Sequence, residues 1–129
     1  MTTLLFTHPA CLDHDPGPQH PERPARLAAI LDALDGLDFA TLERREAPRA
    51  DDAQLTLVHS ALHVQRVLGA VPPAGRARID ADTALSPGSG EAALRAAGAV
   101  CAAVDAVMVG ERQNAFCAVR PPGHHAEPG

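Results

Sequence analysis

A near-continuous apolar run at residues 115–119, Ala-Phe-Cys-Ala-Val, limits the folds open to this chain more than any other feature. A short run without polar alternation is typical of a strand that is buried on both faces of a parallel sheet. The run follows an alanine-rich stretch, residues 89–110, which predicts a central helix that is apolar nearly all round, with Ser89 as its N-cap. Together they predict an α/β fold with a mostly parallel sheet and flanking helices.

The earlier part of the chain supplies the other elements of such a fold. Apolar periodicity and turn residues predict strand 3–7, helix 24–34, strand 42–47, helix 51–58 and helix 60–68, with loops at 11–23 and 75–90. Pro24 suits the first turn of its helix, and Gly36 follows the end of that helix. No internal repeat or linker interrupts this order, so residues 1–129 are predicted to form part of one domain.

Composition narrows the class of protein. The net charge is −5, which argues against nucleic acid or an anionic membrane as a partner. Arg95 and Asp105 interrupt the alanine-rich stretch, which favours a buried helix over a membrane span. The N-terminus lacks a signal-peptide pattern and the three cysteines lack Cys-x-x-Cys spacing, so we expect a cytoplasmic protein with reduced thiols. With three Phe and no Trp or Tyr, the core has few large side chains, and some of its packing partners are expected elsewhere.

The motif that carries chemistry follows the buried strand directly. Residues 120–126 read Arg-Pro-Pro-Gly-His-His-Ala, and α/β folds gather catalytic groups at the carboxyl ends of their strands. The two prolines restrict the backbone, and Gly123 lets it turn into His124 and His125. Two adjacent imidazoles can act as a general base and a polarising group, because their repulsion separates their protonation. Spacing alone leaves two alternatives open, which are solvated bystander histidines and a metal site.

The full motif resembles the histidine-pair motif of the histone deacetylase and acetylpolyamine amidohydrolase superfamily, which has the arginase-type α/β fold. Residues 20–27, His-Pro-Glu-Arg-Pro-Ala-Arg-Leu, are similar to an early signature of that family. Further matches come in the family's order at Val-His-Ser 58–60, at Asp-Ala-Asp-Thr 80–83 and at the helix that contains Gly98. The resemblance therefore covers residues 3–127, and it is strongest to the bacterial, class II-like branch.

The resemblance implies roles for five residues. His125 would be the proton shuttle and His124 an electrostatic stabiliser of the transition state. Asp82 would accept hydrogen bonds from the substrate backbone at the rim of the site, and Gly123 is assigned with it to substrate binding. Arg26 would line an internal cavity below the site.

Structural alternatives to these roles remain open. Asp82 is equally compatible with a loop-capping carboxylate, and Arg26 with a structural ion pair. His20 and His59 are expected to hold loops together rather than to react. The other three histidines outside the motif are expected to be structural or exposed: His8, His14 and His63.

The chain departs from the family pattern after the histidine pair. The family's zinc ligands, two aspartates and a histidine, come later in the sequence, as does a tyrosine that completes the oxyanion site. Only three residues follow Ala126, and the chain has no tyrosine. We therefore expect this chain to be the N-terminal portion of an incomplete domain, with no metal ligand among its own residues. Such a chain would be inactive alone, with zinc bound only when the missing C-terminal half is supplied.

Two classes of function follow from these observations. In the enzyme class, the parent protein would be a zinc-dependent amidohydrolase acting on acetyl-lysine, acetylpolyamine or similar acyl amides. This reaction needs a base for water, an acid for the leaving amine and a donor for the oxyanion. The alternative is a non-catalytic binding or docking module, or a truncated remnant without activity.

Overall fold

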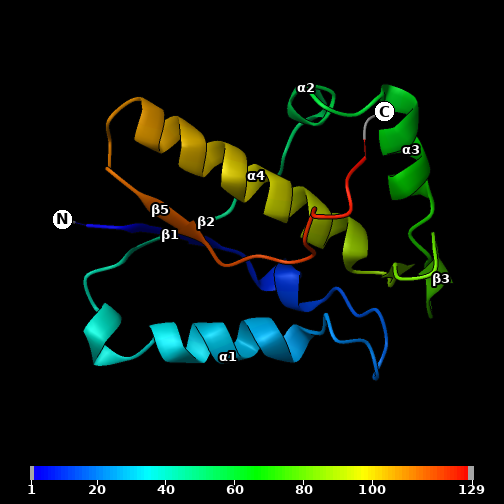
Figure 1. The fold of residues 1–129 in the computed structure, drawn as a ribbon, viewed down its shortest axis with the longest axis horizontal. Coiled ribbons are helices and arrows are strands. Elements are labelled where there is room, and N and C mark those ends of the chain that lie inside the picture. Colours follow the sequence, from blue (N-terminus) through cyan, green and yellow to red (C-terminus); the bar gives the residue numbers. More distant parts are fainter. Residues whose placement is uncertain (1, 128–129) are drawn as a thin grey trace.

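The computed structural model describes residues 2–127 and shows a small parallel sheet with a helix layer on each of its faces (Figure 1). The sheet has strand order β2-β1-β5. Its strands are β1 (Leu4–Thr7), β2 (Glu43–Glu46) and β5 (Ala115–Cys117). Both neighbours of β1 run parallel to it, so the predicted α/β class and parallel sheet are confirmed.

The central strand β1 organises the core because its side chains alternate between the two faces of the sheet. Leu4 and Phe6 pack with the alanines of α4 (Ser89–Met108) on one face. Leu5 packs on the other face with Leu27 of α1 (Pro24–Leu34). The helix predicted over residues 24–34 is confirmed with the same bounds.

Shorter elements connect these layers. They are the 3-10 helices η1 (Pro9–Leu12) and η2 (Leu37–Phe39), the helices α2 (Asp52–Leu55) and α3 (Ala61–Gly69), and the strands β3 (Ala77–Arg78) and β4 (Ala84–Leu85). Asp51 caps α2 through a capping box with Gln54, although this helix is shorter than predicted. Ser60 caps α3 as its side chain accepts the His63 N–H. The region expected to be only a loop, residues 75–90, contains the antiparallel β3–β4 hairpin, which the sequence analysis missed.

The start of α4 corrects another prediction. The N-cap is Gly88 rather than Ser89, and Ser89 is itself the first residue of the helix. The Ser89 hydroxyl instead accepts the Ser86 N–H at 2.7 Å and hydrogen-bonds His14 Nδ1 at 2.6 Å. Serine is a good N-cap, but the hydroxyl of Ser89 is engaged in a long-range contact with His14 that the local sequence does not reveal.

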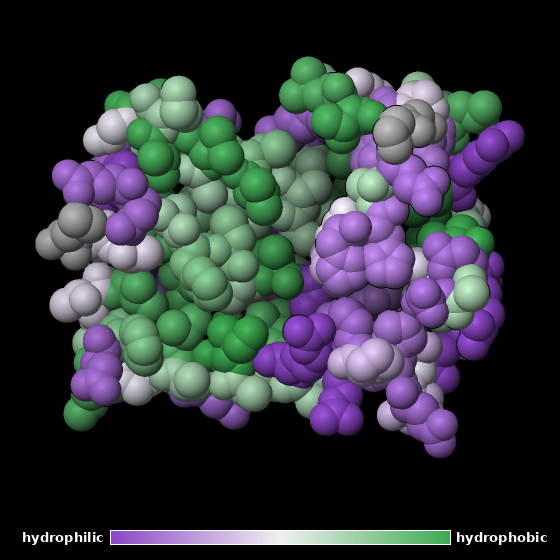
Figure 2. Space-filling view, in the orientation of Figure 1, coloured by the Kyte–Doolittle hydropathy of each residue, from purple (hydrophilic) through white to green (hydrophobic). Residues whose placement is uncertain are grey.

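The last strand is not buried on both faces, contrary to the prediction. β5 lies at the edge of the three-stranded sheet, and the side chain of Phe116 is 48% exposed. The helix α4 also exposes apolar side chains, at Val100, Val104 and Met108. Figure 2 shows the resulting hydrophobic area over α4 and β5. Within the described residues, no helix combines the length and apolar character that a membrane crossing needs.

One glycine fixes how closely α4 approaches the rest of the chain. A Cβ atom at Gly98 would lie 1.9 Å from the Pro48 carbonyl oxygen and 2.7 Å from Ala50 N. The neighbouring contacts reinforce this approach, because Ala50 N donates to Leu94 O at 2.9 Å and Arg95 donates to Ala47 O at 2.9 Å. No larger residue fits at position 98 without displacing the backbone of residues 48–50.

Gly98→Ala is therefore expected to lower the free energy of unfolding by about 2 kcal/mol or more, as overpacking of a filled site does. Urea unfolding followed by circular dichroism measures the change. Gly69→Ala is the matched control, because no atom lies within 4 Å of a Cβ built there. The control should stabilise the protein by roughly 0.5–1 kcal/mol, since alanine is the better helix former. Equal effects of the two substitutions would contradict the packing account.

Candidate active site

A cavity of about 1170 Å³ lies where several loops meet beyond the carboxyl ends of the strands. Its walls come from the loop before α1, the end of α3, the β3–β4 hairpin, the start of α4 and the loop after β5. Four of the five residues assigned from the sequence line it: Arg26, Asp82, His124 and His125. Gly123 lies in the same loop but is not a lining residue. The structure thus brings together groups separated by as many as 99 positions in the sequence.

The two histidines of the motif lie side by side in the wall of this cavity. Their rings are stacked with centroids 4.5 Å apart and an angle of 30° between the ring planes. Both side chains are exposed, so water and a substrate can reach them. Exposed adjacent imidazoles in one cavity are an arrangement that can accept and donate protons.

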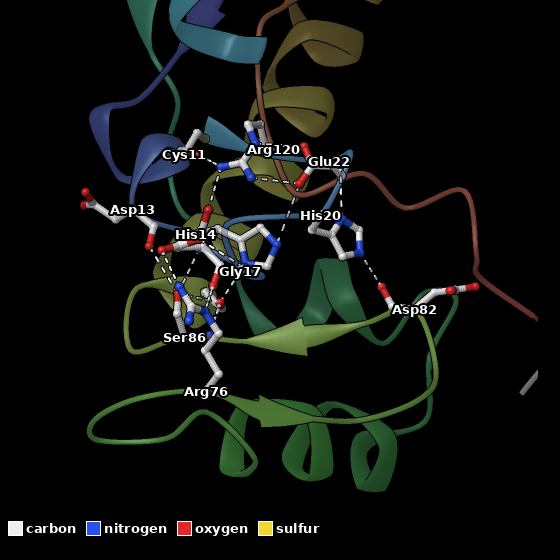
Figure 3. Close-up of polar contacts among 12 residues, drawn as sticks. Cys11, Asp13, His14, Gly17, His20, Glu22, Arg76, Asp82, Ser86 and Arg120 are labelled. Carbon is white, nitrogen blue, oxygen red and sulfur yellow. Dashed lines mark hydrogen bonds and ion pairs between the residues drawn. The ribbon is translucent and has the colours of Figure 1, made fainter. Parts of the chain in front are cut away.

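The loop that carries the histidines is anchored by Arg120, which is buried with 3% exposure. Its guanidinium donates to both carboxylate oxygens of Glu22, each at 2.8 Å. A third nitrogen donates to the carbonyl oxygens of Cys11 at 2.7 Å and His14 at 2.8 Å (Figure 3). This bidentate pair joins the end of β5 to the loop before α1, 98 positions away.

A second buried group, His14, lies beside this pair. It is 5% exposed, and its Nδ1 hydrogen-bonds the Ser89 hydroxyl at 2.6 Å. Burial lowers the pKa of His14, and the positive charge of Arg120 lowers it further, although Glu22 opposes both effects. His14 is therefore structural, as expected, and it ties the loop before α1 to the start of α4.

The hairpin positions Asp82 through its backbone. Asp80 rather than Asp82 caps the turn, because the Asp80 carboxylate accepts the Asp82 N–H at 2.8 Å. That hydrogen bond is the main cause of a lowered pKa at Asp80, and His125 contributes electrostatically. The Asp82 carboxylate has no hydrogen bond or ion pair with another described residue. The loop-capping alternative for Asp82 therefore belongs to Asp80 instead.

Arg26 lines two cavities. Besides the large one, it borders a smaller cavity of about 210 Å³ between α1 and β5, together with Phe116 and His124. Arg26 forms no ion pair with another residue in the range 2–127, so the structural alternative for it is not observed there. Arg26 is exposed, so its guanidinium is available to a ligand.

Metal-ligating side chains do not converge within the described part of the chain. No group of three or more His, Cys, Asp or Glu residues among residues 2–127 could hold a metal ion. The cysteines Cys11, Cys101 and Cys117 are free. The residues present therefore do not by themselves fit a metal centre.

Sequence reasoning missed the support that one buried group, Arg120, gives to the site. Arg120 offered one usable signal, since a charged residue directly after an apolar strand needs a buried partner. Glu22 in the early signature is that partner. His20 was expected to hold loops, and it does so by bonding to Asp82 O at 2.8 Å. His59 instead stacks on His63, with ring centroids 5.0 Å apart.

Arg120→Met should lower the free energy of unfolding by about 3 kcal/mol or more, because it leaves the half-buried Glu22 carboxylate without its partner. Urea unfolding measures the loss. Arg49→Met is the control, since the Arg49–Glu91 ion pair is exposed and its removal should leave the midpoint unchanged within error. A loss at Arg120 no larger than that at Arg49 would contradict the proposed anchoring.

The lowered pKa of His14 predicts a loss of stability in acid. The unfolded chain binds more protons to this residue than the folded chain below about pH 6.5. Stability is thus complete above that pH and falls as the pH drops through the folded pKa. The loss is about 1.4 kcal/mol for each pH unit between the two pKa values. Unfolding at pH 7.5 and 5.0 should show a smaller acid effect in His14→Gln than in the unsubstituted chain or in His63→Gln.

Comparisons with known proteins show the family and the fold of this chain. Residues 20–129 match the family model for the histone deacetylase domain. The histone deacetylase-like amidohydrolase of Pseudomonas aeruginosa is 44% identical over 89 residues, which are 69% of this chain and 23% of that protein. A probable deacetylase of Archaeoglobus fulgidus is 38% identical over 131 residues, covering 99% of this chain and 36% of that protein.

A solved structure extends the likeness to three dimensions. The crystal structure of the HDA15 HD domain superposes with a TM-score of 0.90 and 30% identity, over 98% of this chain and 37% of that one. The chain thus spans about a quarter to a third of the length of these relatives. On the family match and the shared fold together, this chain belongs to the histone deacetylase family.

Proposed function

We propose that this chain carries the proton-handling half of the active site of a zinc-dependent deacetylase. The reaction would be hydrolysis of the amide bond in acetyl-lysine, an acetylated polyamine or a similar acyl amide. The observation that supports this most is the stacked, exposed pair of His124 and His125 in one cavity with Asp82 and Arg26.

The histidine pair suits the two proton transfers of amide hydrolysis. A water molecule must lose a proton as it attacks the carbonyl carbon, and the leaving amine must gain one. His125 would take and return this proton, while His124 would donate to the negative charge that develops on the oxygen. Both rings reach the cavity, so neither role requires a change of fold.

Asp82 and Arg26 suit the binding of such a substrate. The unpaired Asp82 carboxylate can accept hydrogen bonds from the N–H groups next to an acylated amine. Arg26 can interact with the carboxylate product, because a guanidinium pairs with a carboxylate through two parallel hydrogen bonds. Gly123 would contribute to substrate binding through the turn that it allows before the histidines.

Zinc is part of the proposal, although residues 2–127 do not provide a donor set for it. Its ligands would come from residues outside this range. By the same reasoning, the chain alone would be inactive. The partner that completes the site would be the C-terminal part of a deacetylase domain.

A docking function is favoured by a separate observation, the exposed hydrophobic area over α4 and β5. Val104 is 53% exposed and Met108 79% exposed, and one edge of β5 has no neighbouring strand among the described residues. Open apolar strand edges invite pairing with further chain. The same C-terminal part of the domain would cover this area, so docking and catalysis would be two aspects of one assembly.

The test is a chimaera in which residues 1–127 replace the corresponding segment of the Archaeoglobus fulgidus deacetylase. We expect it to release acetate from an acetyl-lysine peptide or an acetylated polyamine, and His125→Ala should lower the rate by about a hundredfold or more. The 129-residue chain alone should release none. His63→Ala is the control, because His63 is exposed on α3 and does not line the cavity.

Two results would contradict the proposal. One is a folded, zinc-loaded chimaera that hydrolyses neither class of substrate. The other is an unchanged rate in the His125→Ala chimaera, which would remove this imidazole from the reaction.

A further inference from the structure

We propose that His20 is a positioning residue that sets the place of Asp82 relative to the histidine pair. This inference rests on the proposed function, because it concerns how the carboxylate that would receive the substrate is held. His20 lies in the loop before α1, and Asp82 lies 62 positions away in the β3–β4 hairpin.

The hydrogen bonds of His20 define which nitrogen carries the proton. Its Nδ1 accepts the Glu22 N–H at 3.1 Å, so this nitrogen must be unprotonated. Its Nε2 lies 2.8 Å from the Asp82 carbonyl oxygen, which can only accept. These two bonds make Nδ1 the acceptor and Nε2 the donor of the ring.

These bonds also exclude a different role for His20. The residue lines the same cavity as His124 and His125, so its position alone would allow it to act as a base. Both of its nitrogens are already engaged with backbone groups. An imidazole whose acceptor nitrogen is occupied cannot take a proton from a substrate without losing that contact.

The tip of the hairpin has few bonds of its own to hold it in place. Its two strands contain only two residues each, and only two residue pairs join them. Within the hairpin, Arg78 donates to Ala81 O at 3.0 Å and Asp80 accepts the Asp82 N–H. These local bonds shape the turn. Arg76 and Ser86 tie the base of the hairpin to the loop before α1, since Arg76 donates to Asp15 and Ser86 donates to Asp13 O, but these bonds do not reach the tip at Asp82.

His20 supplies a long-range hydrogen bond at the tip of the hairpin while leaving the functional group free. It binds the carbonyl oxygen of Asp82, and in Figure 3 the carboxylate of Asp82 extends away from the imidazole. Two residues further on, Glu22 accepts two hydrogen bonds from Arg120, at the start of the loop that carries the histidine pair. One short segment, residues 20–22, therefore places both the rim carboxylate and the imidazoles.

The experiment is nuclear magnetic resonance on the 129-residue chain. Long-range proton–nitrogen correlation spectra of the unsubstituted chain should show the Nε2–H tautomer of His20. The amide of Ile79 donates to Thr83 O at 3.0 Å across the turn that contains Asp82. In His20→Leu, which removes the donor to Asp82 O, this amide should exchange about fivefold to tenfold faster, as loss of one hydrogen bond allows. The amide of Ala99 in α4 should exchange at its original rate.

Two further variants separate positioning from general destabilisation. His20→Gln keeps an N–H group that can reach Asp82 O, and it should restore the slow exchange at Ile79 and the amide shifts of residues 80–83. His63→Leu removes an exposed imidazole outside the cavity, and it should change neither.

Several results would overturn the inference. An Nδ1–H or rapidly averaging tautomer in the unsubstituted chain is one, and it decides the matter even if His20→Leu does not fold. Unchanged exchange at Ile79 in His20→Leu, or acceleration spread equally over α4, is another. None of these measurements involves hydrolysis, so failure of this inference is distinguishable from failure of the deacetylase proposal.

Discussion

The buried ion pair between Arg120 and Glu22 is the interaction on which the site depends. A guanidinium with 3% exposure is costly to bury unless its donors are paired, and here both carboxylate oxygens and two backbone carbonyls accept from it. Because each acceptor belongs to residues 11–22 and the arginine follows β5, the pair joins the first strand's loop to the last strand's loop. The histidine pair takes its position from this junction, only four residues beyond Arg120.

Much of the fold could be predicted from local sequence because local physics decides it. Proline at the first turn and leucines at helical spacing define α1, and its predicted bounds are the observed ones. The predictions that were wrong concern long-range contacts. Ser89 has the chemistry of a cap, but His14 and the Ser86 N–H occupy its hydroxyl. The exposure of β5 could not be predicted from its apolar residues, since strand composition does not say whether a neighbour is present.

Part of the candidate site could likewise be predicted from the sequence, and part could not. Its histidines were predictable because they follow a strand in a stiff, distinctive motif, and the family resemblance added Asp82 and Arg26. Sequence alone left Asp82 equally compatible with substrate binding and with capping of its own loop. The hydrogen bond from Asp82 N to Asp80 resolves that choice and leaves one carboxylate unpaired. The partnership of Glu22 with Arg120 was likewise hidden, although both residues stood in recognised motifs.

The alanine-lined face of α4 has a mechanical consequence. Small side chains allow close contact with the sheet, but they provide few protrusions that interlock with it, so packing alone resists sliding along the helix axis only weakly. The close contact between Gly98 and the Pro48 carbonyl fixes the position of the helix along its own axis. The first turn of α4 borders the cavity. The contact at Gly98, more than two helical turns from Ser89, therefore also fixes how far this first turn extends toward the cavity.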